Sequence, residues 1–180
     1  MSSASLSPAT ELPAATGFDE GRQRSIVRRE LARHSFCTLA TSSGAQRPHV
    51  AGVLYALVGN DLYLTIHDDS VKARNIADNP RVAVCVPIRK VPFFPPFAIQ
   101  FQATATLLDS TDPEITRLVA TGALKKILTG IDLEDPTNRF VSITPGRRIS
   151  TYGLGVPLLQ VIRQPTTAMR SIDWRDTTGR

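Results

Sequence analysis

The chain has 180 residues, of which 42% are hydrophobic and 21% are charged, as in an ordinary globular domain. Its formal net charge of +5 permits an anionic partner without requiring one. Aromatic residues do not alternate with the arginines as a base-stacking surface requires, and no apolar run approaches the ~18 residues of a membrane span. We therefore expect no nucleic-acid partner, no membrane partner and, by default, a cytoplasmic location.

The first third of the chain predicts a tail, a helix and three strands. Residues 1–17 are rich in Ser, Ala, Thr and Pro and indicate a flexible tail. The segment RQRSIVRRELARHS has an apolar helical stripe with arginines on the other face, so a helix should end near His34. Short apolar runs between turn residues then predict strands over 36–41, 49–57 and 62–67.

A short helix over residues 70–78 is the most informative element. It follows a strand, opens with Ser70, Lys72 and Arg74, and ends at Asn79-Pro80. A helix N-terminus presents unpaired N–H groups and a partial positive charge. A hydroxyl and two cations at that point predict a phosphate site. The alternative is a capping serine followed by a solvated basic face.

From residue 81 onward the sequence predicts three strands, one helix and two loops. A strand over 81–87 is followed by KVPFFPPF, whose prolines mark a loop. The strand predicted over 97–108 has apolar residues on one face and the polar Gln100 and Gln102 on the other. We expect the remaining elements to be a helix over 112–128, a strand over 139–144 and a basic loop over 147–153. The favoured interpretation of this loop is a solvated connection, and the alternative is that it closes over an anionic substrate or over the second half of a longer cofactor.

Side-chain chemistry gives few further candidates. Cys37 and Cys85 lie in apolar runs without a CxxC spacing, so we expect buried, reduced thiols. Three histidines without ligand spacing predict no metal site. No nucleophile–base pair stands out, and the catalytic residues remain unknown.

Closely spaced short strands with few helices predict an antiparallel barrel or sandwich. The order of elements, and above all the phrase LYLTIHDDSVKARNIADNPRVAVCV, resembles the pyridoxamine 5′-phosphate oxidase-like, FMN-binding split barrel family. The related flavin/deazaflavin-dependent oxidoreductases share that layout. The flanking phrases FCTLATSSGAQRPHVAGVLY and IQFQATATLLD extend the resemblance to roughly residues 26–152.

The resemblance implies a mostly β fold with flanking helices: a six-stranded antiparallel split β-barrel of the FMN-binding type. The barrel should cover residues 18–155. Residues 156–180 should form a C-terminal extension that packs on the barrel or on a partner subunit.

The resemblance also implies a cofactor site. In the family two subunits pair and the cofactor lies in the cleft between them. Here Ser70, Lys72 and Arg74 match the phosphate-binding turn. His49, Val50 and Ala51 match the strand that runs beside the flavin ring, and the register leaves Thr65 and Ile66 as candidates at the end of the third strand. Gln100, or alternatively Gln102, matches a glutamine on the fifth strand.

The implied activity is that of a flavin-dependent oxidoreductase that binds FMN at a homodimer interface and transfers a hydride to or from a small organic substrate. Flavin chemistry agrees with the missing nucleophile, because the cofactor carries the redox step. A deazaflavin-dependent reductase of the same fold is one alternative. A flavin or haem binding protein without turnover is the other. The two faces of the strand over 97–108 also favour a homodimer, since one face is left for a partner.

Overall fold

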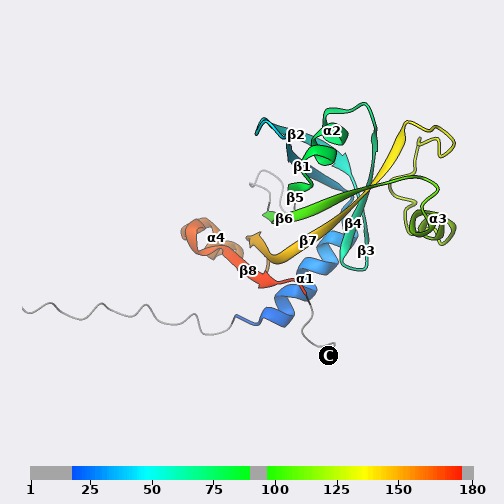
Figure 1. Ribbon diagram of the computed structural model, residues 1–180. Helices are drawn as coiled ribbons and strands as arrows, with labels where there is room; N and C mark the ends of the chain where they lie inside the picture. Colours follow the sequence, from blue (N-terminus) through cyan, green and yellow to red (C-terminus); the bar gives the residue numbers. More distant parts are fainter. Residues whose placement is uncertain (1–17, 90–96, 176–180) are drawn as a thin grey trace, which may run out of the picture.

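The computed structural model describes residues 18–89 and 97–175, and a single antiparallel sheet dominates these ranges. The sheet curls into a half-open barrel with helices around it (Figure 1). Its strand order is β2-β1-β5-β6-β7-β4-β3, and β8 pairs with the second half of β7. The strands are β1 (Phe36–Ser42), β2 (Pro48–Leu54), β3 (Ala56–Val58), β4 (Asp61–His67), β5 (Arg81–Ile88), β6 (Phe97–Leu108), β7 (Asn138–Tyr152) and β8 (Met169–Asp173).

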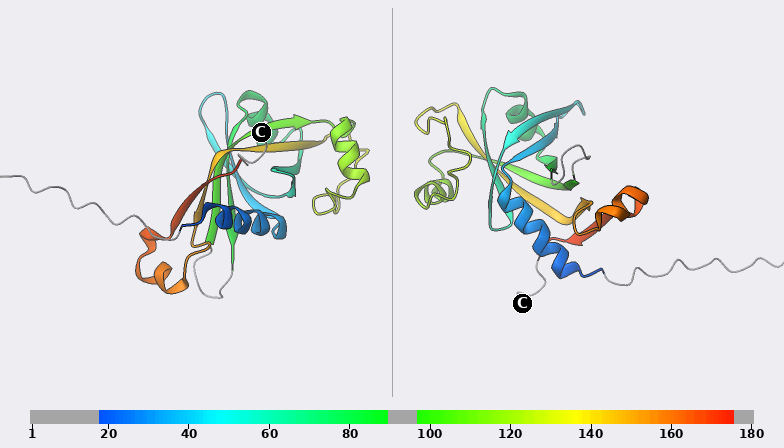
Figure 2. Two further views of the ribbon diagram at one scale, coloured as in Figure 1. Left: turned by 90° about the horizontal axis from the view of Figure 1, so that it is seen from below. Right: turned by 180° about the vertical axis from the view of Figure 1, so that it is seen from behind.

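Five short helical segments accompany the sheet. Helix α2 lies at one end of the curled sheet and α1 crosses the opposite end, while α3 and α4 stand out on different sides (Figures 1 and 2). None of the helices in the described ranges combines the length and the apolar character that a membrane crossing needs. The segments are α1 (Glu20–Arg33), α2 (Val71–Asp78), α3 (Pro113–Ala120), α4 (Leu158–Arg163) and the 3₁₀ turn η1 (Pro165–Thr167).

The main core fills the inside of the curl. Alternate side chains of the strands point into it, which gives β1 and β6 their regular alternation of buried and exposed positions. Helix α1 adds Val27 and Leu31, and α2 adds Ala73 and Ile76. A second, smaller core lies beneath α3. The predicted fold class, an antiparallel split barrel with flanking helices, is thus confirmed, although the described sheet has eight strands rather than six.

One predicted strand, over 49–57, is in fact two. Strand β2 ends at Leu54 and β3 begins at Ala56, and the two lie at opposite edges of the sheet. Tyr55 makes the break, because its backbone N–H donates to Ser35 O over 2.7 Å and its hydroxyl donates to Leu31 O over 2.9 Å. Hydropathy alone does not reveal this anchor, since Tyr55 continues an apolar run.

The end of the chain is more ordered than the sequence suggested. Strand β7 continues to Tyr152, so residues 147–152 are strand and the predicted basic loop over 147–153 is wrong for them. Strand β8, which we did not predict, pairs with this part of β7. Trp174 follows it, is buried, and donates from Nε1 to Asn60 O over 3.2 Å.

The helix predicted over 112–128 is shorter than expected. Asp112 caps it and Pro113 begins it, but α3 ends at Ala120. The chain then turns at Gly122, whose φ of +70° favours glycine. The segments 1–17 and 90–96, which hold the predicted tail and most of the proline-rich loop, lie outside the described residues.

Candidate cofactor and substrate site

The start of α2 has the form that the sequence predicted. Strand β4 ends at His67, and Ser70 caps the helix three residues later. Its Oγ accepts from Ala73 N over 3.2 Å, and its carbonyl accepts from Arg74 N over 3.1 Å. The amides of Val71 and Lys72 come before the first residue that can bond within the helix, so they have no intrahelical acceptor. They form the positive end of the helix dipole.

Lys72 lies on the flank of α2 that faces β1 and β2. Three residues later, on the same flank, the buried Asn75 donates from Nδ2 to Thr41 Oγ1 over 3.0 Å. Thr41 pairs with His49 across β1 and β2. Lys72 is itself half-buried. The structure therefore brings Ser70 and Lys72 to the same end of the barrel as His49.

The strand residues predicted beside the cofactor differ in access. His49 and Ala51 are half-buried on one face of β2, and Val50 between them points to the other face. On β4, Thr65 is half-buried, whereas Ile66 lies in the main core. Of the two registers left open by the sequence, only the one with Thr65 leaves a side chain accessible to a ligand.

Arg74 lies on a different flank of α2. Its Nη1 donates to the carbonyl of Asp69, and its side chain lines a cavity of about 400 Å³ beside Leu107. In the same cavity Arg139 forms an ion pair with Asp109. The structure thus separates Arg74 from Lys72, although the sequence placed them in one cluster.

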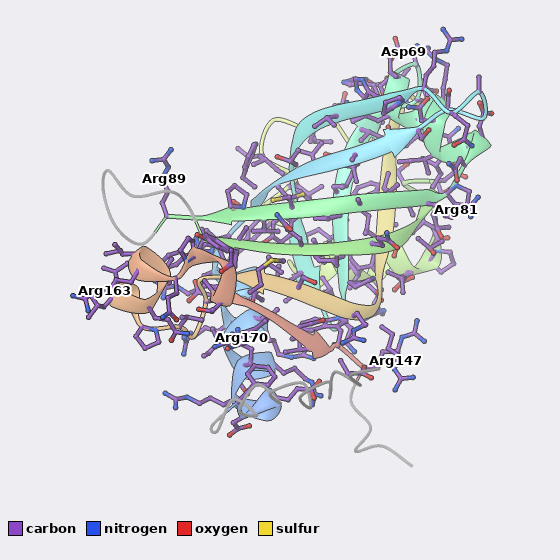
Figure 3. The ribbon with its side chains drawn as sticks, turned by 90° about the vertical axis from the view of Figure 1, so that its left-hand side faces the viewer. Asp69, Arg81, Arg89, Arg147, Arg163 and Arg170 are labelled. Carbon is purple, nitrogen blue, oxygen red and sulfur yellow. The ribbon has the colours of Figure 1, made fainter. Side chains whose placement is uncertain are left out.

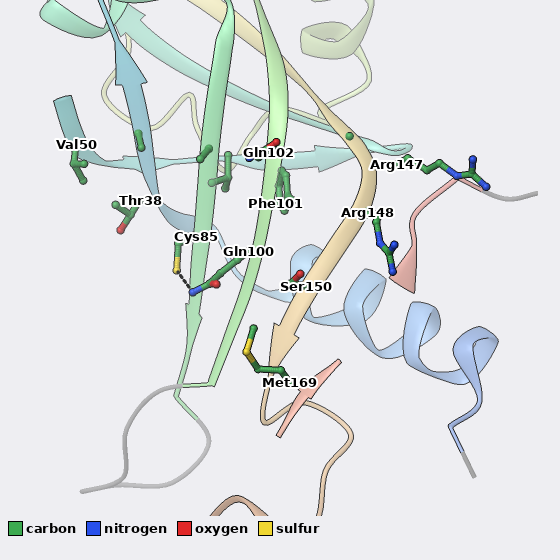
Figure 4. A pocket seen from close by; sticks show the side chains of 14 residues that line it. Thr38, Val50, Cys85, Gln100, Phe101, Gln102, Arg147, Arg148, Ser150 and Met169 are labelled. Atoms are coloured by element: carbon green, nitrogen blue, oxygen red, sulfur yellow. Dashed lines mark hydrogen bonds between the residues drawn. The ribbon is translucent and has the colours of Figure 1, made fainter. Parts of the chain in front are cut away.

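The outer face of the sheet carries the other predicted residues, Val50 and Gln100. A groove of about 720 Å³ runs over strands β1, β2, β5, β6 and β7 on this face. Figure 3 looks onto the face, and Figure 4 shows the groove. Gln100 Nε2 contacts Cys85 Sγ at 3.9 Å. The lining residues are Thr38, Ala40, Val50, Ala83, Val84, Cys85, Gln100, Phe101, Gln102, Gly146, Arg147, Arg148, Ser150 and Met169.

This outer face is apolar and open. Val50 is 61% exposed, and Phe36 and Leu54 are about half exposed on the same pair of strands. Cys85, expected to be buried, is only half-buried here, because the alternation of β5 turns it outward while Val84 and Val86 point into the core. Cys37 is fully buried, as expected, and burial raises the pKa of its thiol to about 12.

A β-bulge shapes one side of the groove. Phe101 pairs with Ile149, but Ala103 pairs with Pro145, so three residues of β7 face the single Gln102. A Cβ on Gly146 would lie 3.0 Å from the carbonyl oxygen of Gln102, which explains a glycine at this position. A bulge re-aims side chains, and both Arg147 and Arg148 are exposed as a result.

The strongly shifted titrating groups lie outside the groove. Burial raises the pKa of Tyr55, which is anchored to α1. Burial, followed by the hydrogen bond to Glu114, raises the pKa of Tyr63 to about 12. In the described ranges no three His, Cys, Asp or Glu side chains gather as a metal site requires. The donors at the start of α2 and the open groove suit the binding and orientation of a ligand.

Sequence reasoning missed most of the groove lining. Thr38, Ala40, Ala83 and Ser150 are small side chains at outward positions of their strands. The alternation along each strand was the available signal, but the pairings of β1 with β5, of β5 with β6 and of β6 with β7 were needed to bring them together.

Comparisons with known proteins bear on the family and the fold. The sequence profile of the family described as pyridoxamine 5′-phosphate oxidase matches residues 26–147. No curated protein gives a significant sequence match.

Solved structures share the fold at low sequence identity. The haem binding protein from Mycobacterium smegmatis is 17% identical with a TM-score of 0.67, over 84% of this chain and 58% of that one. HutZ, the haem storage protein from Vibrio cholerae, is 18% identical with a TM-score of 0.62, and the match covers 72% of this chain and 94% of that one. General stress protein 26 from Bacillus anthracis is 22% identical with a TM-score of 0.54, and the match covers 71% of this chain and 92% of that one.

Proposed function

Because the chain belongs to the pyridoxamine 5′-phosphate oxidase-like family, we propose that it is a flavin-dependent oxidoreductase. FMN is held between two subunits, and the substrate is a small organic molecule. The observation that carries this proposal is the N-terminus of α2, where the chain presents free backbone amides, a serine hydroxyl and a half-buried lysine.

The residues at the start of α2 fit the phosphate of FMN. The amides of Val71 and Lys72, the Ser70 hydroxyl and the Lys72 ammonium are all donors, and a phosphate needs several. The exposed carboxylates of Asp68 and Asp69 precede the cap and oppose an anion.

A bound flavin supplies the redox chemistry by exchanging a hydride with the substrate. The chain contributes binding, orientation and exclusion of water. We assign the phosphate to the start of α2 and the ring to the backbone of β2 around His49 and Ala51, with Thr65 facing it. The groove beside Val50 and Gln100 is left for the substrate and for residues of the second subunit.

A second copy of the chain is the proposed partner. The outer sheet face exposes Phe36, Val50 and Leu54, and an open apolar face of this kind favours association. Helix α4 stands beside that face (Figure 1) and exposes Leu159 and Ile162. We therefore propose that the extension beginning at residue 156 packs on its own barrel through β8 and on the partner subunit through α4.

The cytoplasm is the proposed location. Cys37 and Cys85 are both free thiols, which is typical of a reducing compartment.

Ligand titration of Lys72→Ala tests the proposed function, with Arg74→Ala as the matched control. Both variants remove one cation from α2, but Arg74 lines a separate cavity. Loss of one charge-assisted contact costs about 1–3 kcal/mol, so Lys72→Ala should weaken FMN binding about 5- to 150-fold. Arg74→Ala should change it less than about threefold.

Riboflavin, which lacks the phosphate, provides the second control. Its affinity should be the same for the wild type and for Lys72→Ala. Equal FMN affinity of the wild type and Lys72→Ala would contradict the phosphate assignment. Titration with a deazaflavin coenzyme in parallel decides between the two cofactors, because the tighter ligand identifies the cofactor.

A second candidate function, binding of haem without turnover, is favoured by two sulfur side chains. Cys85 and Met169 both line the groove, and thiolate and thioether sulfur are ligands of haem iron. Titration with haemin should then produce a Soret band that shifts in Cys85→Ser or Met169→Leu. An unchanged spectrum in both variants would remove this candidate.

A further inference from the structure

The groove on the outer sheet face has an unbalanced charge. Its fourteen lining residues include two arginines, Arg147 and Arg148, and no carboxylate. Both arginines are exposed, and they come from the bulged part of β7. The sequence profile of the family ends at residue 147, so Arg148 and the β8 residues beside it belong to a part of the chain that the family match does not cover.

The two arginines differ in their partners. Arg147 Nε donates to Asp173 Oδ2 over 2.6 Å, and this contact lowers the pKa of Asp173 and raises that of Arg147. In Figure 4 Arg147 points away from the other lining side chains. Its charge is thus already balanced by a carboxylate on β8.

Arg148 has a different partner. Its Nε contacts Ser171 Oγ at 3.3 Å, and within the described ranges its guanidinium forms no ion pair. The other nearby acid, Glu20, accepts from Asp173 N and lies 3.8 Å from Arg24. The serine therefore holds Arg148 in place while most of its donors stay available, and a guanidinium offers two parallel donors to a carboxylate or phosphate.

The rest of the groove suits a flat apolar body. Its floor is the surface of a sheet, with Ala40, Val50 and Ala83 toward β2 and Met169 toward β8. Gln100 and Ser150, which form a cross-strand pair, lie between these apolar residues and offer hydrogen bonds in the middle of the floor. A ligand that uses the whole groove is therefore apolar and planar over most of its length and negatively charged at the end near Arg148.

We propose that Arg148, oriented by Ser171, anchors the anionic group of the substrate, and that the substrate class is a planar apolar molecule bearing a carboxylate, sulfonate or phosphate. This proposal rests on the proposed function in that the groove is taken to lie beside the flavin. The anchor itself requires only the groove.

Two fluorescent probes with nearly the same apolar body test the anchor. Anilinonaphthalene sulfonate carries the anion, and N-phenylnaphthylamine lacks it. Both are titrated into the full-length protein with FMN present in excess, for the wild type, Arg148→Gln, Arg148→Lys and Arg147→Gln. FMN occupancy is read from its absorbance, and subunit assembly from sedimentation.

Arg148→Gln should weaken binding of the sulfonate about tenfold, the size expected for one charge-assisted contact. It should change binding of the uncharged probe less than about twofold. Arg148→Lys should retain part of the affinity, and Arg147→Gln should retain nearly all of it, because that charge is already balanced.

Equal sulfonate affinity in the wild type and in Arg148→Gln would overturn the proposal. An equal loss of affinity for the charged and the uncharged probe in Arg148→Gln would also overturn it. Dissociation of the subunits in Arg148→Gln would do the same, because it would assign Arg148 to the interface. An Arg148-dependent sulfonate site in a protein that never binds FMN would support the anchor and contradict the proposed function. A protein that binds FMN but whose sulfonate affinity does not depend on Arg148 would support the proposed function and contradict the anchor.

Discussion

Asn75 of α2 donates from Nδ2 to Thr41 Oγ1 of β1 over 3.0 Å, and both side chains are buried. This hydrogen bond fixes the rotation of α2 about its own axis relative to the sheet. Since Lys72 lies one turn earlier on the same flank, the bond also sets the direction in which the first turn of the helix faces.

The first prediction concerns this bond. Asn75→Ala leaves Thr41 without its partner in a buried position, so the free energy of unfolding should fall by about 1–3 kcal/mol. The double variant Asn75→Leu with Thr41→Val removes both polar groups and should recover part of that loss. Urea unfolding measures both. If the double variant loses as much free energy of unfolding as Asn75→Leu and Thr41→Val lose in sum, the two side chains are not coupled.

The second prediction concerns the proposed dimer. Val50→Asp places a charge in the middle of the exposed apolar sheet face and should give a single chain by sedimentation at concentrations where the wild type forms two. Leu133→Asp is the matched control, because Leu133 is also an exposed apolar residue but lies away from that face, between α3 and β7. Dissociation of both variants, or of neither, would contradict the assignment of the face.

The third prediction concerns the two thiols. Cys85 is half-buried in the groove, whereas Cys37 is fully buried and its pKa is raised to about 12 by burial. A thiol reagent acts on the accessible thiolate, so mass spectrometry should find the native protein labelled at Cys85 alone. Cys85→Ser should then resist labelling until it is unfolded. A ligand in the groove should slow the reaction, and labelling of native Cys37 would show that the barrel opens.

The fourth prediction is a pH dependence of stability. The pKa of Tyr63 is raised from 10.0 to about 12 by burial and by its hydrogen bond to Glu114, so the unfolded chain loses this proton first. The contribution of Tyr63 to stability is thus complete below pH 10 and is lost as the pH rises toward about 12. Urea unfolding between about pH 9 and about pH 11 should show a smaller decrease for Tyr63→Phe than for the wild type. Parallel curves for the two proteins would contradict it.

Local signals in the sequence were enough for the elements at the start of the site. The capping serine, the apolar stripe of α2 and the Asn79-Pro80 stop all act within one or two turns, and α2 begins and ends where they predict. The strands β1, β4 and β5 also lie within one residue of their predicted bounds. Their alternation is set by the core that they cover, and it is visible in the chain itself.

The groove could not be predicted in the same way, because it depends on contacts between distant segments. Pro145 and Gly146 are typical of a strand end, yet β7 continues past them since β6 and β8 flank it on both sides and the bulge absorbs the extra residues. Whether Arg147 or Arg148 keeps an available charge depends on Asp173, which lies on a strand that the sequence did not reveal. Arg74 and Lys72 lie on different flanks of α2, because residues two positions apart on a helix do not face each other, and grouping them by their closeness in the chain overlooked this.

The two edge strands of the sheet, β2 and β3, are separated in the chain by Tyr55 alone. The gap in the barrel wall is therefore bridged by a peptide linkage where a closed barrel would have hydrogen bonds between strands. A break in the backbone at Tyr55 would leave β2 paired with β1 and β3 paired with β4, but would remove the direct covalent link between the two unpaired edges. A break in the turn between β1 and β2, by contrast, would leave the two edges joined through Tyr55. The two edges of the wall are thus joined at one buried tyrosine in an apolar run, and the hydrogen bonds from Tyr55 to Ser35 and Leu31 hold that junction against α1 and the start of β1.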